Sequence, residues 1–105
     1  MDETKYQDAM TIILHAGNAK AFAMEAIDDS ETGDFEAAET ALENARSEMG
    51  AAHAMQFGMV QHEAAGEPVD VNIILVHAQD HLTMAIQSID FAERFIKLYR
   101  LIATR

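Results

Sequence analysis

Two histidines and an aspartate lie close together in the last third of the sequence. They are His77, Asp80 and His81, and two residues separate His77 from Asp80. If this segment is helical, positions i, i+3 and i+4 lie on one face, so two imidazoles and one carboxylate converge. Such a cluster is able to bind a metal ion or to perform chemistry on a histidine nitrogen.

The spacing alone leaves three interpretations open. The first is structural, with the three side chains as polar residues on a solvated helix face or as satisfied buried histidines. The second is a metal site, because histidines at i and i+4 ligate zinc or another transition ion and Asp80 could complete the site. The sequence lacks the H-E-x-x-H motif of zinc proteases and the Glu-x-x-His motif of di-iron bundles, so neither class is expected.

The third interpretation is nucleophilic catalysis, in which a neutral imidazole nitrogen of His77 accepts a phosphoryl group and passes it on. Histidine suits this role because it has a free lone pair near neutral pH. Gln79 and His81 could donate hydrogen bonds to the phosphate oxygens. Asp80 would repel a phosphate, which indicates that its carboxylate faces something positive, such as a metal ion.

The composition indicates the elements that must position these residues. Nineteen alanines, one proline and five glycines favour helices, and breaks at residues 28–34 and 65–68 leave three long segments. We expect Asp34 to be the N-cap of the second helix and Asp70 that of the third. The sequence therefore predicts an all-α fold: an antiparallel three-helix bundle, spectrin-like and up-down-up, in a single domain over residues 1–105. Helices of about 25–30 residues are roughly 40 Å long, so the bundle should be elongated.

Apolar residues with alternating spacings of four and three indicate how the predicted helices pack. The stripe of the first segment is expected to form the core, with Gly17 allowing close approach. The third segment carries two stripes, so it should contact more than one partner surface. The members are Tyr6, Met10, Ile13, Gly17, Lys20, Met24 and Ile27 in the first segment; Ala38, Leu42, Ala45, Met49, Ala52, Gln56 and Met59 in the second; Leu75, Leu82, Ile86, Ile89 and Ile96, and then Ile74, Ala85, Ala92, Phe95, Tyr99 and Ile102, in the third.

The charge balance excludes several classes of partner. The 105 residues include 7 basic and 18 acidic side chains, a formal net charge of −11, which opposes binding to nucleic acids or anionic lipids. Nine of the acids lie between Glu25 and Glu48, as a solvated face or as a surface that attracts a basic partner. The absence of cysteine excludes disulfide and thiol chemistry. A polar start and the lack of an apolar run near 20 residues predict a cytoplasmic protein without a membrane segment.

Residues 77–82, with the sequence His-Ala-Gln-Asp-His-Leu, carry a specific resemblance. This segment, called the signature below, is very similar to the active-site signature of the enzyme IIA component of the lactose/cellobiose/diacetylchitobiose class of the bacterial sugar phosphotransferase system. Residues 15–19, 33–35, 52–56 and 94–100 support the same resemblance. The chain as a whole therefore resembles a subunit of that family.

The resemblance implies a fold, partners and site residues. It implies a homotrimer of three-helix subunits, a nine-helix bundle with its active sites between subunits. His77 would be the phosphorylated nucleophile, charged by the phosphocarrier HPr and discharged to the sugar-specific IIB protein or domain during disaccharide uptake. Gln79 and His81 would support the phosphohistidine. Asp80 would meet its symmetry mates on the threefold axis around a divalent cation such as Mg²⁺, and no organic cofactor is implied.

Other function classes stay open beside this phosphocarrier. A non-catalytic trimeric helical adaptor and a metal-binding helical protein would both fit the helical composition. Among the remaining histidines, His15 and His62 are expected to be structural or exposed. The second helix could bring His53 and Gln56 toward the site. Phosphoryl transfer from phospho-HPr distinguishes the carrier from the other two classes.

Overall fold

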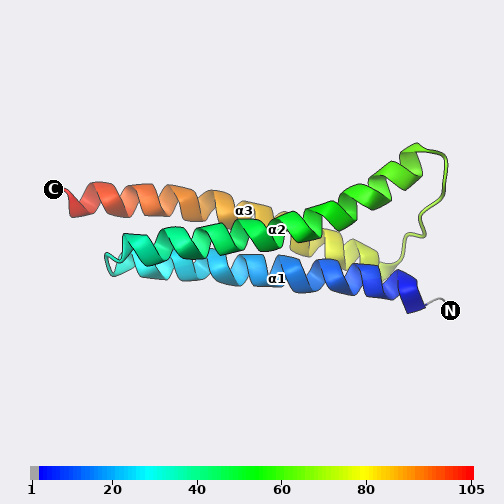
Figure 1. Cartoon of the computed structure of the whole chain (residues 1–105), viewed down its shortest axis with the longest axis horizontal. Coiled ribbons are helices and arrows are strands. Elements are labelled where there is room, and N and C mark those ends of the chain that lie inside the picture. Colours follow the sequence, from blue (N-terminus) through cyan, green and yellow to red (C-terminus); the bar gives the residue numbers. More distant parts are fainter. Residues whose placement is uncertain (1–2) are drawn as a thin grey trace.

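The structure, a computed structural model, describes residues 3–105, with side chains from Tyr6 onward. It consists of three long helices: α1 (Glu3–Glu31), α2 (Phe35–Ala64) and α3 (Ile73–Ala103). They run antiparallel in chain order, and no strand occurs between residues 3 and 105 (Figure 1). The molecule measures 57 × 23 × 18 Å, so the predicted elongated three-helix bundle is confirmed. No helix within this part of the chain is long and apolar enough to cross a membrane.

Side-chain caps begin the second and third helices. The Asp34 carboxylate accepts a hydrogen bond from the Ala37 amide at 3.2 Å, which confirms the predicted N-cap of α2. The prediction of Asp70 as the cap of the third helix is wrong. Asn72 caps α3 instead, and its side-chain oxygen accepts from the Leu75 amide at 2.8 Å. Because a cap must directly precede the first helical turn, the extended backbone of Asn72 fixes the start of α3 at Ile73.

The turn between α1 and α2 is shorter than the predicted break. Helix α1 continues through residues 28–31, three of which are acidic, and the chain reverses within residues 32–34. Gly33 has a φ of +85°, a left-handed conformation that favours glycine because it has no β-carbon. Ser30 is buried in the last turns of α1, and its hydroxyl is satisfied by donating to the Ala26 carbonyl oxygen at 2.9 Å.

Alanines form most of the core. The stripe predicted as the core of the first helix is wrong, because Met10, Gly17, Lys20 and Met24 are exposed. Gly17 has no neighbour within 4 Å of a built β-carbon, so it does not serve close helix contact within the chain. Small side chains at the centre let α1 approach both of its neighbours closely, while larger side chains lie at the flanks. The buried line on α1 is Ala9, Ile12, Ala16, Ala19, Ala23 and Ala26.

The other two helices agree better with the predicted stripes. The stripe of α2 is confirmed through its four buried members, Ala38, Leu42, Ala45 and Ala52. The two stripes of α3 contribute to one buried face, and α3 contacts both α1 and α2, so it has two partner surfaces within the chain. The outer members of the stripes are exposed. The buried face of α3 is Ala78, Leu82, Ala85, Ile89, Ala92 and Ile96. The exposed members are Ile86, Phe95 and Ile102.

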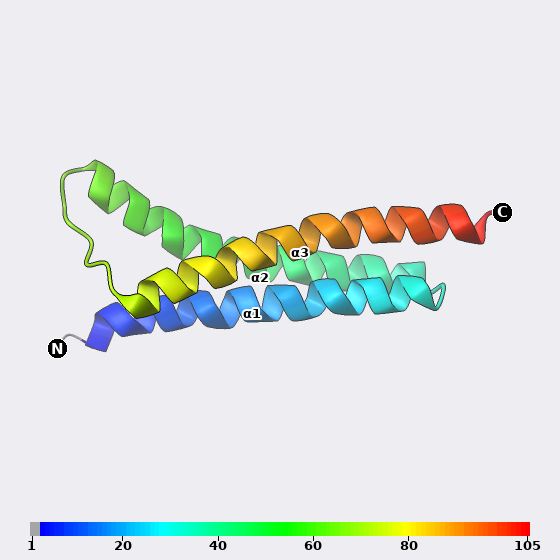
Figure 2. The same ribbon diagram turned by 180° about the vertical axis from the view of Figure 1, so that it is seen from behind.

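The helices do not stay together along their whole length. Helix α1 packs along both α2 and α3, whereas the C-terminal half of α2 bends away from the bundle (Figures 1 and 2). An eight-residue segment, residues 65–72, returns from this limb to the start of α3. The first turns of α3, which carry the signature, therefore lie beside the point where α2 diverges.

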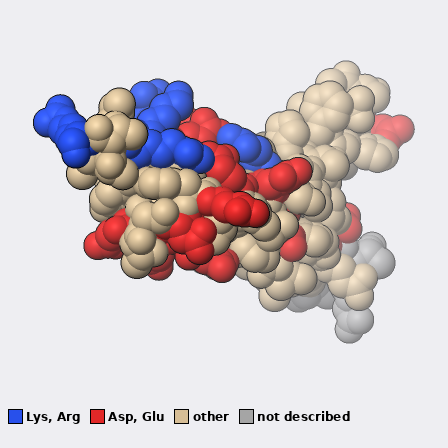
Figure 3. Space-filling view, turned by 60° about the vertical axis from the view of Figure 1, so that its left-hand side comes forward, with Lys and Arg blue, Asp and Glu red and all other residues tan. Residues whose placement is uncertain are grey.

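Charges separate along the molecule. Basic side chains gather at the C-terminal end of α3, while acidic side chains line the neighbouring surface of the bundle (Figure 3). Two contacts join this end of α3 to α2: Arg46 pairs with Glu93 at 2.5 Å, and Arg100 pairs with Glu39 at 3.2 Å. The Arg100 guanidinium also lies over the Phe35 ring, 4.8 Å from its centroid. The net negative charge of the chain is thus offset locally where α3 ends.

Candidate functional site

Two histidines of the signature touch each other on α3. The Nε2 atoms of His77 and His81 are 3.1 Å apart, and the two rings meet edge to face with centroids 4.5 Å apart. His77 is exposed and His81 is half-buried. When both rings are neutral, one Nε2 donates its proton and the other accepts with its lone pair. The pair therefore places an unprotonated nitrogen beside an N–H donor, and both become available to a substrate when the hydrogen bond between them opens.

Asp80 lies on the same side of α3 but is exposed to solvent. Over the part of the chain that the structure describes, no group of three His, Asp or Glu side chains is arranged to hold a metal ion. The carboxylate of Asp80 is an oxygen ligand of the kind that hard divalent cations prefer. A metal site on Asp80 would therefore need carboxylates from further copies of the chain.

Gln79 faces away from His77. Two residues of α-helix correspond to a rotation of roughly 200°, so the two side chains leave α3 on nearly opposite sides. The half-buried amide of Gln79 accepts a hydrogen bond from Gln56 Nε2 of α2 at 3.0 Å through its own Oε1. Within one chain, the structure brings His81 to His77 but does not bring Gln79 there.

Gln56 is a further site candidate, and its sequence position predicts only that it approaches the site from the second helix. It lies in the stripe of α2 and ends the segment 52–56 that supports the family resemblance. Gln56 and Gln79 form one edge of a small cavity of about 190 Å³ between the diverging limb of α2 and the start of α3. The rest of its lining is apolar except for Glu63: Met59, Val60, Val69, Val71, Leu75 and Val76.

The remaining histidines lie away from the His77 and His81 pair. His15 of α1 contacts Glu48 of α2 through Nδ1 at 2.5 Å, so it links two helices. His62 pairs with Glu67 just beyond the end of α2. His53 is exposed and stacks on Phe57 at 6.3 Å between ring centroids. Of the two residues that the second helix was expected to bring toward the site, Gln56 contacts Gln79 of the signature, on the side of α3 opposite His77.

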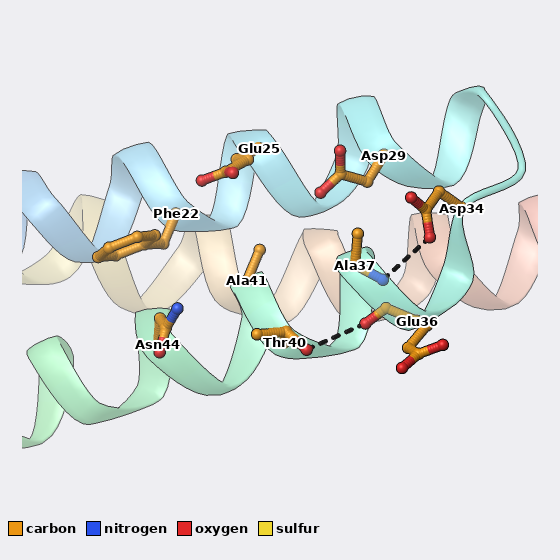
Figure 4. A pocket seen from close by; sticks show the side chains of 9 residues that line it. All are labelled: Phe22, Glu25, Asp29, Asp34, Glu36, Ala37, Thr40, Ala41 and Asn44. Carbon is orange, nitrogen blue, oxygen red and sulfur yellow. Dashed lines mark hydrogen bonds between the residues drawn. The ribbon is translucent and has the colours of Figure 1, made fainter.

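A second hollow lies at the opposite end of the bundle. It has a volume of about 450 Å³ between the end of α1 and the start of α2, and carboxylates surround it (Figure 4). One of these, Asp34, caps α2, and the Thr40 hydroxyl donates to the Glu36 carbonyl oxygen. No histidine lines this hollow. The histidine chemistry that the sequence predicts therefore belongs to the other end of the bundle, near the start of α3.

Comparisons with known proteins identify the family of the chain. The model described as PTS system, lactose/cellobiose specific IIA subunit, matches residues 7–100. The chain is 42% identical over 99 residues to the lichenan-specific phosphotransferase enzyme IIA component of Bacillus subtilis, covering 94% of this chain and 90% of the relative. It is 41% identical over 83 residues to the cellobiose-specific EIIA component of Lactococcus lactis, covering 79% and 72%.

Solved structures extend the likeness to the fold. The cellobiose-specific enzyme IIA of Bacillus anthracis superposes with a TM-score of 0.96 at 37% identity, covering 100% of this chain and 96% of that one. The IIA(chitobiose) chain in its complex with HPr from the Escherichia coli phosphotransferase system gives a TM-score of 0.81 at 27% identity, covering 94% and 96%. The chain therefore belongs to the lactose/cellobiose-specific IIA subunit family of the phosphotransferase system.

Proposed function

We propose that the chain is a phosphohistidine carrier of sugar uptake, with His77 as its nucleophile. It accepts a phosphoryl group from phospho-HPr and passes it to a IIB protein or domain in the cytoplasm, during uptake of a disaccharide. The contact between His77 Nε2 and His81 Nε2 at 3.1 Å carries this proposal. The related IIA(chitobiose) chain in complex with HPr supports HPr as the donor.

The His77 and His81 pair suits both half-reactions. When His81 Nε2 carries the proton and donates to His77 Nε2, the His77 nitrogen is unprotonated; as phospho-HPr enters, this hydrogen bond opens and the freed lone pair attacks phosphorus in line with the HPr leaving group. A bond forms between His77 Nε2 and phosphorus as the bond to HPr breaks. The His81 N–H then donates to a phosphoryl oxygen, which needs a donor because it carries negative charge. Transfer to IIB runs the same displacement with IIB as the attacking group.

We further propose a homotrimer of nine helices. Large apolar side chains remain exposed along α3, and burying them against other copies would remove this area from water. Because Gln79 leaves α3 on the side opposite His77, its amide is placed to serve the His77 of a neighbouring copy. The exposed residues of α3 that support this assembly are Met84, Ile86, Phe91, Phe95, Leu98, Leu101 and Ile102.

In this trimer, Asp80 would lie near the threefold axis. Three carboxylates around one axis repel one another, and a divalent cation such as Mg²⁺ would offset that repulsion. The three copies of Asp80 would hold the ion. When bound, the ion would supply positive charge for assembly, while the phosphoryl chemistry stays with His77.

A labelling experiment tests the carrier against a non-catalytic adaptor or a metal-binding protein. The purified chain is incubated with enzyme I, HPr and phosphoenolpyruvate and then weighed by intact-mass spectrometry. We expect one acid-labile phosphoryl group per chain, and none on His77→Gln at unchanged helicity. The matched control is His53→Gln, another exposed histidine, which should be labelled normally. Equal labelling of His77→Gln would contradict the assignment, and no labelling of the unaltered chain would favour the adaptor.

A further inference from the structure

The hydrogen bond between Gln56 and Gln79 joins α2 to α3 beside the signature. Gln56 Nε2 donates to Gln79 Oε1 at 3.0 Å, and the two positions are 23 apart in the sequence. Both side chains are half-buried. The pair lines the small cavity between α2 and the start of α3, and the C-terminal half of α2 diverges from the bundle (Figures 1 and 2).

A carboxamide has one accepting side and one donating side. With Oε1 of Gln79 engaged by Gln56, its Nε2 hydrogens are directed away from Gln56. Phosphoryl oxygens accept hydrogen bonds and do not donate them, so only the amide edge of Gln79 is useful to a phosphohistidine. Without Gln56, the amide would be free to turn its oxygen toward the phosphoryl group, where it repels.

The apolar surroundings of the two glutamines favour a single orientation of the Gln79 amide. The cavity beside the pair is lined mainly by apolar side chains, so water competes less for the two amides than it would on an open surface. Removing one partner of a hydrogen bond in such a setting also costs more free energy, because the other amide is left partly buried without a partner. The hydrogen bond from Gln56 therefore holds the amide of Gln79 in one orientation.

We infer that Gln56 is a positioning residue for phosphoryl transfer, acting through the amide of Gln79. This inference rests on the proposed function, in which Gln79 donates to the phosphoryl group on His77 of a neighbouring copy. Gln56 does not itself touch the reacting atoms. Its contribution should appear in the rate of transfer and in the lifetime of the phosphohistidine.

A double-mutant cycle tests the inference. Gln56→Met and Gln79→Met remove either amide at similar side-chain length. Each single variant should slow transfer from phospho-HPr about tenfold and speed phosphohistidine hydrolysis, because a hydrogen bond to a charged group is lost or misaligned. The double variant should be no slower than Gln79→Met alone. The matched control Gln61→Met, also on α2 but exposed, should transfer at the unaltered rate.

Gln56→Glu provides a second variant of nearly unchanged shape. Its carboxylate accepts but does not donate, so it should turn the Gln79 oxygen outward and slow transfer at least as much as Gln56→Met. Gln61→Glu controls for the added charge. A normal rate in both Gln56 variants, or slowing of about one hundredfold in the double variant, would overturn the inference. If His77→Gln stays unlabelled in the same assay, such a result leaves the carrier function intact; labelling of His77→Gln would remove both.

Discussion

The Nε2 atoms of His77 and His81 lie 3.1 Å apart, one helical turn from each other on α3. The contact is a consequence of i, i+4 spacing on a helix whose start Asn72 fixes five residues earlier. Through this contact, His81 can donate a hydrogen bond to the unprotonated nitrogen of His77 before transfer and to a phosphoryl oxygen after transfer. The first prediction concerns this neighbour.

Replacing His81 should slow phosphorylation without preventing it. In His81→Ala, the lone pair of His77 is still available, but the donor to the phosphoryl oxygen is lost. A hydrogen bond to a charged group contributes about 1.5–3 kcal/mol, so we expect labelling by phospho-HPr to slow roughly 10- to 100-fold. Quench-flow labelling measures this rate. His53→Ala, another histidine on a helix surface, should label normally, and an unaltered rate in His81→Ala would argue against His81 as the donor.

Replacing Asp80 should affect assembly through charge. Asp80→Leu removes three like charges from the proposed threefold axis, so the trimer should be at least as stable as the unaltered one and should lose any stabilisation by Mg²⁺. Thermal unfolding with and without Mg²⁺, together with light scattering, measures both effects. Asp90→Leu, an exposed acid further along α3, should keep the response to Mg²⁺. Dissociation of Asp80→Leu into monomers would show that repulsion at Asp80 does not dominate.

Replacing a core alanine by a larger side chain should destabilise the bundle. Ala19 is fully buried on α1, whereas Ala21 on the same helix is exposed. Ala19→Leu inserts a larger side chain where closely packed helices leave no room, and we expect a loss of about 1–3 kcal/mol in the free energy of unfolding. Ala21→Leu should change it by less than about 0.5 kcal/mol. Urea denaturation measures both, and equal values for the two variants would contradict the observed core.

Local sequence determined much of the fold. Few breakers, a high alanine content and a capping aspartate at position 34 are features that act within one or two helical turns, so three helices and the start of α2 could be predicted directly. The pairing of His77 with His81 is local in the same sense, because helix geometry alone brings positions i and i+4 together.

The buried residues of α1 and the cap of α3 could be identified only from the tertiary structure. Stripes of large apolar residues and stripes of alanine have the same spacing, and which one is buried depends on how closely α2 and α3 approach α1. The approach is close, so Ala16 and Ala23 are buried while Met10 and Met24 are exposed. Similarly, Asp70 and Asn72 are both good caps by type, and the path of the segment after α2 selects Asn72.

By itself, then, the sequence determined the three helices, the cap of α2 and the histidine pair, because these depend on neighbours within a few positions. The tertiary structure decided which face of α1 is buried and which side chain meets Gln79. The physical reason is the same in both cases, because both depend on how the helices pack: Gln56 contacts Gln79, 23 positions later in the sequence, only because α3 returns beside α2.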